Sequence, residues 1–368
     1  MSDIPALPYV RDIAPYQGGK PIDELAREYG LDPKSIIKLA SNENPRGMPE
    51  SARHAITSAM TDLGRYPDSN GFELKSAVSE TFNVPADWIT LGNGSNDILE
   101  LAAAALLSPG RSCVYAQHAF AVYALATQAR GARAIVVPAR DLGHDLEAMA
   151  SAIASDTALI YIANPNNPTG THLPADAVTR FLAGVPRQVV VVIDEAYNEY
   201  LPPDRRFDSV QWVRQHPNVL ISRTFSKAYG LAGLRVGYGL AQPVLTDLLN
   251  RVRQPFNVNA VAQAAALAAL QDRAYLERSY QLNIAGMQRM IDAFRRLQLD
   301  FVPSYGNFVL VKVGDAIRVY EELLKRGVIV RPVANYDLPE WLRITIGLPD
   351  ENERFVQALA ESLEAVAA

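Results

Sequence analysis

The sequence predicts an α/β protein: a mostly parallel sheet sandwiched by helices, with a smaller α+β domain after it. Short runs rich in β-branched residues alternate with longer helical patterns through the middle of the chain. One run, 189–193, is apolar at every position, which is typical of a strand covered on both faces. The chain has 368 residues, of which 49% are hydrophobic, and this is enough for one large and one smaller domain.

The expected elements follow one another in the order of a parallel sheet with crossover helices. Strands are predicted at 112–116, 134–137, 158–163, 189–193, 219–222 and 236–240. Helices are predicted at 97–107, 122–129, 146–153, 176–182 and at the alanine-rich segment 260–270.

The last part of the chain has a different pattern. Long helical patterns at 275–297, 316–326 and 351–367 enclose strand candidates at 308–313 and 341–346, which predicts a small α+β domain. We expect a large domain of residues 45–270 and a small domain built from both chain ends, residues 1–44 and 271–368.

Composition and charge exclude several classes of function. A net charge of −5 without a basic block argues against nucleic acid or an anionic membrane as partner. The single Cys113 rules out an internal disulfide, and five well-separated histidines show no ligand spacing, so no metal is expected. The first residues lack the basic and apolar regions of an export signal, and apolar runs such as 101–107 are too short to cross a bilayer. We therefore expect a cytoplasmic protein.

Lys227 is the single lysine between Lys75 and Lys312, although arginines are scattered through this interval. A site that needs only positive charge can use arginine, but a nucleophilic amine requires lysine, because guanidinium does not lose its proton. A solitary lysine just past a predicted strand is therefore a candidate for Schiff-base formation. The alternative is an ordinary surface lysine in an arginine-rich protein.

Other chemically active residues follow the ends of neighbouring predicted strands. These are Phe120 after 112–116, Asn167 in the Asn-Pro-Asn-Asn-Pro-Thr-Gly loop after 158–163, Asp194 and Tyr197 after 189–193, and Lys227 after 219–222. In a parallel sheet, ligands bind outside the carboxyl ends of the strands. We expect these side chains to converge on one crevice.

The combination of residues suits pyridoxal phosphate, the commonest protein-bound aldehyde. That cofactor needs an acid at its ring nitrogen, and Asp194 could supply it. Tyr197 and Asn167 can hydrogen-bond the phenolic oxygen of the cofactor. The alternatives are a helix N-cap for Asp194 and a turn residue for Asn167.

A phosphate site is predicted at the start of the helix that begins at Asp97. The run Gly-Asn-Gly-Ser-Asn at 92–96 places glycine-rich backbone N–H groups at a helix N-terminus, where an anion binds. Thr224, Ser226 and Arg235 would add hydroxyls and a fixed charge. Such runs are often plain loops, and Arg235 could instead be a solvent-facing residue that opens a strand.

Together these motifs resemble the pyridoxal-phosphate-dependent aminotransferases of fold type I. The resemblance rests on Ser226-Lys227 followed by Arg235, on the 164–170 loop, and on Asp194-x-x-Tyr197. It extends over nearly the whole chain through motifs at 15–20, 39–45, 65–68 and 342–347, which are similar to the histidinol-phosphate aminotransferase subgroup.

The resemblance implies a role for each site residue. Lys227 would form the Schiff base and carry the proton, Asp194 would hold the pyridine nitrogen, Asn167 and Tyr197 the phenolic oxygen, and Phe120 would stack on the ring. The phosphate would be held by Gly94, Ser95, Asn96, Thr224, Ser226 and Arg235, with Tyr66 reaching it from the partner subunit of a homodimer. Arg343 would bind the substrate's carboxylate or phosphate, with Arg331, Tyr16 and Asn307 lining the same pocket; ordinary structural roles remain as alternatives for these four.

The implied reaction is amino transfer between L-histidinol phosphate and 2-oxoglutarate, giving imidazole acetol phosphate and glutamate, a step of histidine biosynthesis. The chain departs from the subgroup at His118-Ala119-Phe120, where the subgroup has Pro-Thr before the aromatic residue. An aromatic amino-acid aminotransferase and a phosphothreonine decarboxylase-like enzyme therefore remain as alternatives. A ligand-sensing regulator would need a DNA-binding segment, and nothing before Tyr16 is long enough to form one.

Overall fold

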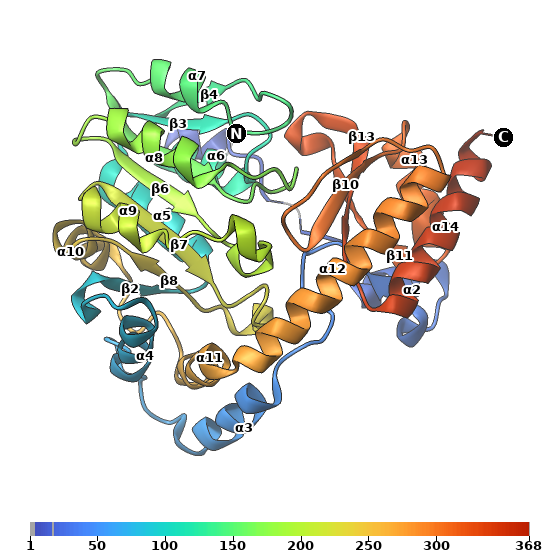
Figure 1. Cartoon of the computed structure of the whole chain (residues 1–368), viewed down its shortest axis with the longest axis horizontal. Helices are drawn as coiled ribbons and strands as arrows, with labels where there is room; N and C mark the ends of the chain where they lie inside the picture. Colours follow the sequence, from blue (N-terminus) through green and yellow to red (C-terminus); the bar gives the residue numbers. More distant parts are fainter. Residues whose placement is uncertain (1–3, 17, 368) are drawn as a thin grey trace.

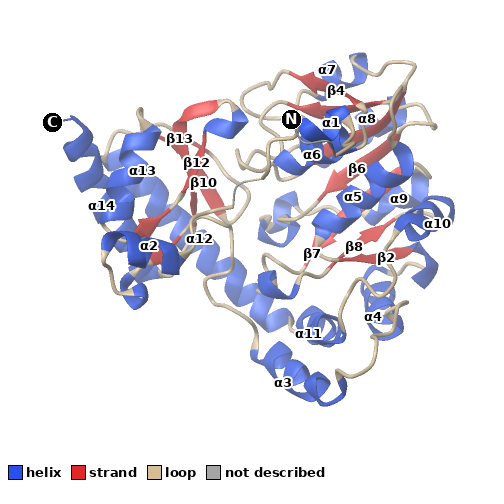
Figure 2. Cartoon of the chain, turned by 180° about the vertical axis from the view of Figure 1, so that it is seen from behind, coloured by secondary structure: helices blue, strands red, loops and turns tan. Residues whose placement is uncertain are grey.

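The structure is a computed structural model that describes residues 4–16 and 18–367. It contains a seven-stranded sheet covered by helices and, beside it, a smaller part built on a four-stranded sheet (Figures 1 and 2). A single 24-residue helix, α12 (Arg273–Arg296), runs from the larger part into the smaller one (Figure 1). No helix in the described residues is long and apolar enough to cross a membrane. Gln17, in the predicted motif at 15–20, and residues 1–3 and 368 of the expected small domain lie outside the described residues.

The larger sheet has the strand order β2-β8-β7-β6-β5-β3-β4. Its strands are β2 (Ile89–Gly92), β3 (Ser112–Ala116), β4 (Arg133–Val137), β5 (Thr157–Ala163), β6 (Val190–Asp194), β7 (Val219–Thr224) and β8 (Gly237–Leu240). The pairs from β4 to β7 are parallel, and β8 is antiparallel to both β2 and β7. The predicted, mostly parallel sheet is therefore confirmed, with β2 as a strand that the sequence analysis missed.

The central strands β5, β6 and β7 are buried at every position because both faces of the sheet are covered. In β6, Val191 and Ile193 belong to one buried cluster, whereas Val190 and Val192 belong to another. The covering helices are α3 (Glu50–Ala59), α4 (Phe72–Phe82), α5 (Ser95–Leu106), α6 (Ala121–Ala129), α7 (Leu146–Ser151), α8 (Ala175–Gly184), α9 (Val210–Gln215), α10 (Pro243–Val252) and α11 (Ala260–Gln271). Alternate side chains of one strand thus anchor two helical layers.

The smaller part combines segments from the two ends of the chain. Its sheet, in the order β12-β13-β10-β9, is antiparallel. The strands are β9 (Phe301–Val302), β10 (Phe308–Lys312), β12 (Arg331–Val333) and β13 (Leu338–Thr345), and β1 (Ile37–Lys38) pairs in parallel with β11 (Val328–Ile329). The helices are α2 (Ile22–Tyr29), α12, α13 (Ala316–Lys325) and α14 (Pro349–Ala367), while α1 (Pro8–Arg11) packs against α6 of the larger part.

One detail of the sequence analysis is wrong. Arg235 does not open a strand: it follows the 3-10 turn Ala232–Leu234 with a φ of 56°, and β8 begins at Gly237. The backbone must turn here because the residues after Lys227 leave β7 and return antiparallel to it.

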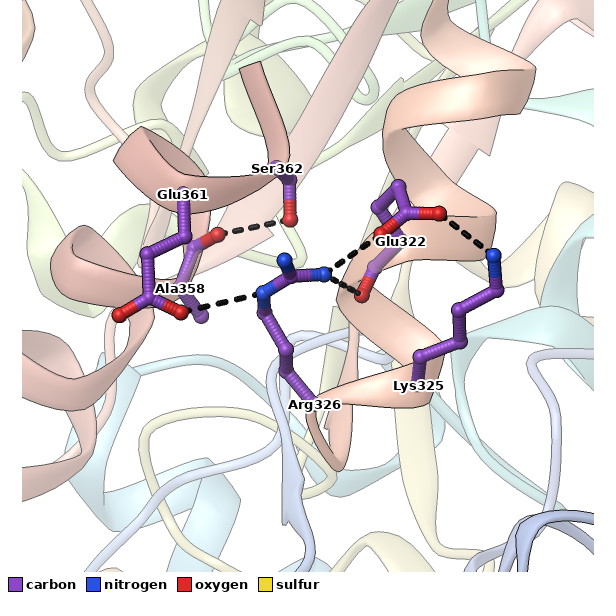
Figure 3. A network of polar contacts seen from close by, with 6 residues as sticks. All are labelled: Glu322, Lys325, Arg326, Ala358, Glu361 and Ser362. Atoms are coloured by element: carbon purple, nitrogen blue, oxygen red, sulfur yellow. Dashed lines mark hydrogen bonds and ion pairs between the residues drawn. The ribbon is translucent and has the colours of Figure 1, made fainter. Parts of the chain in front are cut away.

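Helices α13 and α14 are joined by a partly exposed polar network (Figure 3). Arg326, just after α13, donates from Nε to Glu361 Oε2 at 3.1 Å and from Nη1 to Glu322 Oε2 at 2.7 Å. Exposed ion pairs contribute about 0–1 kcal/mol each. The two helices are therefore held mainly by their buried faces, where Leu323 and Leu359 belong to one apolar cluster.

The close packing of α12 against the end of β13 can be tested at Gly286. A Cβ on Gly286 would lie 2.4 Å from Ile346 Cγ2, so Gly286→Ala should lower the free energy of unfolding by about 1–3 kcal/mol. Gly184→Ala, in α8, is the control: no described atom lies within 4 Å of its Cβ position, and alanine favours a helix by up to about 1 kcal/mol. Urea unfolding of both variants measures the difference, and equal stabilities would contradict the packing.

Candidate active site

The structure brings the predicted strand-end residues together at one edge of the larger sheet. Asp194 is the last residue of β6, Asn167 lies in the loop after β5, and Lys227 follows β7. Arg343, on β13 of the smaller part, reaches the same place and donates from Nη1 to Asn167 Oδ1 at 2.5 Å. The crevice is therefore built from both parts of the chain.

Asp194 is buried, with an exposed fraction of 4%. Its Oδ2 accepts a hydrogen bond from the Tyr123 hydroxyl at 3.0 Å, while its buried Oδ1 has no partner in the described part of the chain. Burial raises the pKa of this carboxyl to about 6, against the lowering effect of the Tyr123 hydrogen bond. The helix N-cap alternative is wrong, because Asp194 ends a strand and the next helical turn begins at Asn198.

Lys227 points into the crevice and not into bulk solvent. Its Nζ donates to the carbonyl oxygen of Ser41 at 3.0 Å and lies 5.8 Å from the centre of the Tyr197 ring. Burial, helped by the positive charges of Arg343 and Arg235, lowers the pKa of the amine to about 8. With this pKa about a tenth of the amine is neutral and nucleophilic at pH 7, far more than for a lysine with the ordinary pKa of 10.5.

Tyr197 is buried between the two parts, edge-on to Phe308 at 5.1 Å between ring centres. Its hydroxyl oxygen accepts a hydrogen bond from Asn42 Nδ2 at 2.9 Å. Burial raises the pKa of this phenol to about 12, so the hydroxyl keeps its proton and can donate it.

The predicted phosphate site lies at the N-terminus of α5. Its first residues are Ser95 and Asn96, and Gly94 precedes them with a φ of +81°. Arg235 Nη1 donates to Ser226 Oγ at 3.3 Å, and a Cβ on Gly94 would lie 2.8 Å from Arg235 Nη2. The glycine is therefore needed both for its backbone conformation and for the approach of the guanidinium.

The predicted phosphate site continues into the segment that carries Lys227. Thr224, the last residue of β7, accepts a hydrogen bond at Oγ1 from the backbone N–H of Ser226 at 3.1 Å. Both hydroxyl-bearing residues are buried. The predicted anion site and the lysine are thus parts of one short stretch of chain.

A cavity of about 1150 Å³ lies between the two parts of the chain, and its lining includes none of Asn167, Asp194, Lys227 and Arg343. Its lining includes Tyr16, His118, Phe120 and Arg331, and the Arg331 guanidinium carbon lies 5.7 Å from the centre of the Tyr16 ring. Phe120 also packs edge-on against Tyr123 at 5.9 Å, and Tyr123 in turn binds Asp194. Phe120 therefore joins the cavity to the strand-end cluster.

The unusual His118 connects the two parts of the molecule. Its φ is 55°, and its Nδ1 lies 2.5 Å from the carbonyl oxygen of Tyr336, in the 3-10 turn Ala334–Tyr336. A carbonyl oxygen only accepts, so Nδ1 carries the proton. The departure from the subgroup's pattern thus places a ring in the cavity wall and a hydrogen bond between the two parts.

Arg343 and Asn307 are buried with unused polar atoms. Arg343 Nη2 donates to the Ala40 carbonyl at 2.6 Å, and its Nε has no partner among the described residues. Asn307 Nδ2 donates to the Asn42 carbonyl at 3.0 Å, while its Oδ1 is likewise unpartnered in the described chain. Both side chains can offer hydrogen bonds to a ligand.

Tyr66 does not join the cluster. Its side chain is 81% exposed and stacks on Phe256 with 4.6 Å between the ring centres. Within one chain it contacts none of the groups described above, as far as the described residues show.

The sequence analysis did not assign a role to the segment 40–44. In the structure this segment crosses the crevice: carbonyl oxygens of Ala40 and Ser41 accept from Arg343 and Lys227, and Asn42 donates to Tyr197. The signal in the sequence is a cluster of small polar residues directly after a short apolar run, which is typical of a loop. Nothing local shows that the loop lies beside residues about 150 to 300 positions away.

A buried ion pair, also missed, ties the ends of β6 and β7 together. Glu195 Oε2 accepts from Arg223 Nε at 2.9 Å and from the Ser209 hydroxyl at 2.8 Å, and the two charged side chains are 6% and 9% exposed. These residues neighbour Asp194 and Thr224 in the sequence. The pair therefore holds the two strand ends that present the site.

Removal of one partner of this pair should be costly. Glu195→Ala leaves the Arg223 charge buried and unpaired, which should lower the free energy of unfolding by about 3–5 kcal/mol. Asp292→Ala is the matched control, since Asp292 and Arg295 form a pair with side chains 55% and 65% exposed, worth about 0–1 kcal/mol. Urea unfolding compares the two variants. If Glu195→Ala loses as little free energy of unfolding as the control, the Arg223–Glu195 pair does not stabilise the two strand ends.

Comparisons with known proteins identify the family of this chain. The sequence profile of the aminotransferase class I and II family matches residues 34–359. The chain is 68% identical to histidinol-phosphate aminotransferase 1 of Cupriavidus pinatubonensis, over 97% of this chain and 96% of that protein. It is 67% identical to histidinol-phosphate aminotransferase 2 of Ralstonia nicotianae, over 96% of each. The chain therefore belongs to the aminotransferase class I and II family.

Solved structures show the same fold. The crystal structure of histidinol-phosphate aminotransferase from Sinorhizobium meliloti in complex with pyridoxal-5'-phosphate matches with a TM-score of 0.91 and 29% identity, covering 99% of both chains. A putative histidinol-phosphate aminotransferase from Erwinia carotovora atroseptica matches with a TM-score of 0.84 and 26% identity, covering 96% of this chain and 99% of that one. The predicted fold class and the predicted class of enzyme are confirmed.

Proposed function

We propose that this enzyme transfers an amino group between L-histidinol phosphate and 2-oxoglutarate, with pyridoxal 5'-phosphate as cofactor, in histidine biosynthesis. The observation that carries the proposal is the 67–68% identity, over nearly the whole chain, to proteins named histidinol-phosphate aminotransferases. The products are imidazole acetol phosphate and glutamate. These relatives favour histidinol phosphate over the aromatic amino acids and phosphothreonine considered as alternatives.

The residues of the crevice fit the cofactor. Asp194 Oδ1 is buried without a partner in the described chain, and a carboxylate oxygen in this state suits the N–H of a pyridinium ring. Backbone N–H groups at the start of α5, with Ser226 and Arg235 beside them, suit a phosphate. The segment that carries Lys227 connects these two places: β7 pairs with β6 beside Asp194, and Ser226 at the phosphate site directly precedes Lys227.

We assign the cofactor contacts accordingly. Lys227 would hold the cofactor covalently through its amine, Asp194 would bind the pyridine nitrogen, Asn167 and Tyr197 would bind the phenolic oxygen, and Phe120 would lie on the ring. Gly94, Ser95, Asn96, Thr224, Ser226 and Arg235 hold the phosphate. Lys227, Asp194 and Tyr197 are the catalytic residues among them.

The protein residues hold and move protons around the cofactor. When bound, pyridoxal phosphate supplies an electron sink for the bond that breaks at the substrate's Cα. Asp194, ionised beside the ring nitrogen, keeps that nitrogen protonated, and Tyr197 keeps its proton and donates to the phenolic oxygen. Lys227 takes the proton from Cα and returns it; its pKa of about 8 suits a general base near neutral pH.

Attachment of the cofactor to Lys227 should report the lowered pKa. The rate of pyridoxal phosphate attachment to the cofactor-free protein should rise with pH and level off above about pH 8, because the amine is then neutral. Borohydride reduction and peptide mapping should place the label on Lys227, and Lys227→Arg should bind cofactor without a reducible link. A rate that keeps rising to pH 10, or a label on Lys75, would contradict the assignment.

We assign substrate binding to Arg343, Arg331, Tyr16 and Asn307. Arg343 already holds the Asn167 amide, and its guanidinium can pair with a carboxylate in a bidentate way. Arg331 and Tyr16 face each other in the lining of the 1150 Å³ cavity, which has room for an imidazole ring and a phosphate. Placed arginines are needed because the net charge of −5 does not attract anions.

Arg343→Lys should lower kcat/KM for both substrates by roughly 10- to 150-fold, which corresponds to a charged hydrogen bond of about 1.5–3 kcal/mol. Lysine keeps the charge but cannot make the bidentate contact. Arg326→Lys, in the partly exposed network between α13 and α14, is the control and should keep the activity. Steady-state assays decide: an effect on glutamate alone would assign the phosphate to Arg331, and no effect would remove Arg343 from the site.

We further propose a homodimer in which Tyr66 reaches the cofactor phosphate of the partner subunit. The support is a set of exposed apolar side chains near Tyr66 in the sequence, together with Phe256, whose ring stacks on Tyr66; exposed apolar side chains mark interaction surfaces. The set comprises Met60 (60% exposed), Leu63 (52%), Tyr66 (81%), Phe72 (66%) and Phe256 (42%).

Complementation tests the shared site. In a mixture of Lys227→Ala and Tyr66→Glu chains, a mixed dimer has one site with both lesions and one with neither, so up to about a quarter of the activity should return. Lys227→Ala mixed with Asp194→Asn is the control, because both lesions act in their own chain and no intact site forms. Verified exchange of subunits without recovery in the first mixture would exclude a Tyr66 contact across the interface.

We also propose the domain division and the location of the enzyme. Residues 45–270 form the large domain, and residues 1–44 with 271–368 the small one, so that the crevice lies where the two meet. The main support is the seven-stranded sheet within the first range and the pairing of β1 with β11 within the second. A cytoplasmic location is supported by Cys113, a free buried thiol of the kind that persists in a reducing compartment.

A further inference from the structure

Asn42 occupies a strained and fully buried position beside the crevice. Its exposed fraction is 1% and its φ is 55°, a conformation that costs most residues energy but that asparagine tolerates. Its side chain contacts two groups: Tyr197 on the larger part and Thr345 at the end of β13 on the smaller part.

The hydrogen bonds around Asn42 fix the direction of each proton. The backbone N–H of Asn42 donates to Thr345 Oγ1 at 2.9 Å, so the Thr345 hydroxyl is free to donate its own proton, and Asn42 Oδ1 lies 3.1 Å away to accept it. The amide oxygen of Asn42 is thus used by Thr345. The atom 2.9 Å from the Tyr197 hydroxyl must then be the NH₂ group, which only donates.

We infer that Asn42 is a positioning residue that aims the hydroxyl proton of Tyr197 at the phenolic oxygen of the cofactor. Because Tyr197 accepts from Asn42, its single proton points elsewhere, and the crevice side is where the proposed cofactor lies. The inference rests on the proposed function. Thr345 fixes the orientation of the Asn42 amide, and the amide fixes the direction of the Tyr197 hydroxyl proton. That proton is then donated to the phenolic oxygen of the cofactor.

The consequence is measurable on the bound cofactor. The cofactor linked to Lys227 has a visible absorbance that changes when the proton shared by the linking nitrogen and the phenolic oxygen is lost. A hydrogen bond donated by Tyr197 stabilises the negative phenolic oxygen without that proton, and so lowers the pH of the spectral midpoint. Loss of the donation should raise the midpoint.

Asn42→Asp tests the inference, because a carboxylate accepts only and would draw the Tyr197 proton to itself. The spectral midpoint should rise by about one pH unit, equivalent to about 1.4 kcal/mol. Asn44→Asp is the matched control: it adds the same charge to the same segment, but Asn44 Nδ2 bonds Ala228 O and Ser279 Oγ and not Tyr197. Its midpoint should move by much less.

A double-mutant cycle separates the effect of Asn42 through the Tyr197 hydroxyl from a direct effect of the added charge on the cofactor. Tyr197→Phe should raise the midpoint by itself, and Asn42→Asp should add no further shift in that background. The charged groups that act on Tyr197 or Lys227, namely Glu43, Asp194, Arg235 and Arg343, are the same in all four proteins and cancel from the comparison. An equal shift by Asn42→Asp with and without the Tyr197 hydroxyl would overturn the inference.

Thr345 provides an independent variant if Asn42→Asp does not fold. Thr345→Val removes the proton that fixes the amide and should raise the midpoint, whereas Thr345→Ser keeps it and should restore the original value. A midpoint unchanged in Thr345→Val would also overturn the inference. A protein that gives no visible absorbance with pyridoxal phosphate would instead refute the proposed function, so the two failures are distinguishable.

Discussion

A carboxylate held away from water at the end of the central strand β6 is the constraint on which the site depends. Burial, only partly offset by the Tyr123 hydrogen bond, raises the pKa of Asp194 from 3.8 to about 6, which corresponds to a net cost of about 3 kcal/mol for the ionised form. Apolar layers on both faces of the sheet, with the buried Arg223–Glu195 pair beside it, hold this group in place. A cationic ring nitrogen beside the carboxylate offsets this cost, so the buried Asp194 favours binding of a cofactor that carries such a nitrogen.

Local sequence patterns were sufficient for six of the seven strands of the larger sheet and for the residues at its edge. An all-apolar strand can exist only where helices cover both faces, and parallel strands deliver the residues after them to one edge. The sequence alone therefore predicts that Asn167, Asp194 and Lys227 lie close together. The fold places them within one crevice because the strand register fixes where each strand ends.

Contacts between distant segments could not be predicted in the same way. Asn42 meets Thr345 across 303 residues, and Arg343 meets Asn167 across 176, and no short pattern reports such pairings. Strand β2 was missed because it is short and ends in Gly92, which weakens a strand pattern, whereas β8 was predicted in spite of Gly237 and Gly239. Close approaches explain these glycines: a Cβ on Gly237 would lie 2.5 Å from the backbone nitrogen of Ser95.

The central claim is that this crevice transfers the amino group of histidinol phosphate. Single-turnover absorbance of the cofactor-loaded enzyme, mixed separately with L-histidinol phosphate, phenylalanine and phosphothreonine, tests it most directly. The account predicts the fastest loss of the cofactor's visible band with L-histidinol phosphate and its return when 2-oxoglutarate is added. A faster reaction with phenylalanine, or a reaction with phosphothreonine that releases carbon dioxide, would contradict the account.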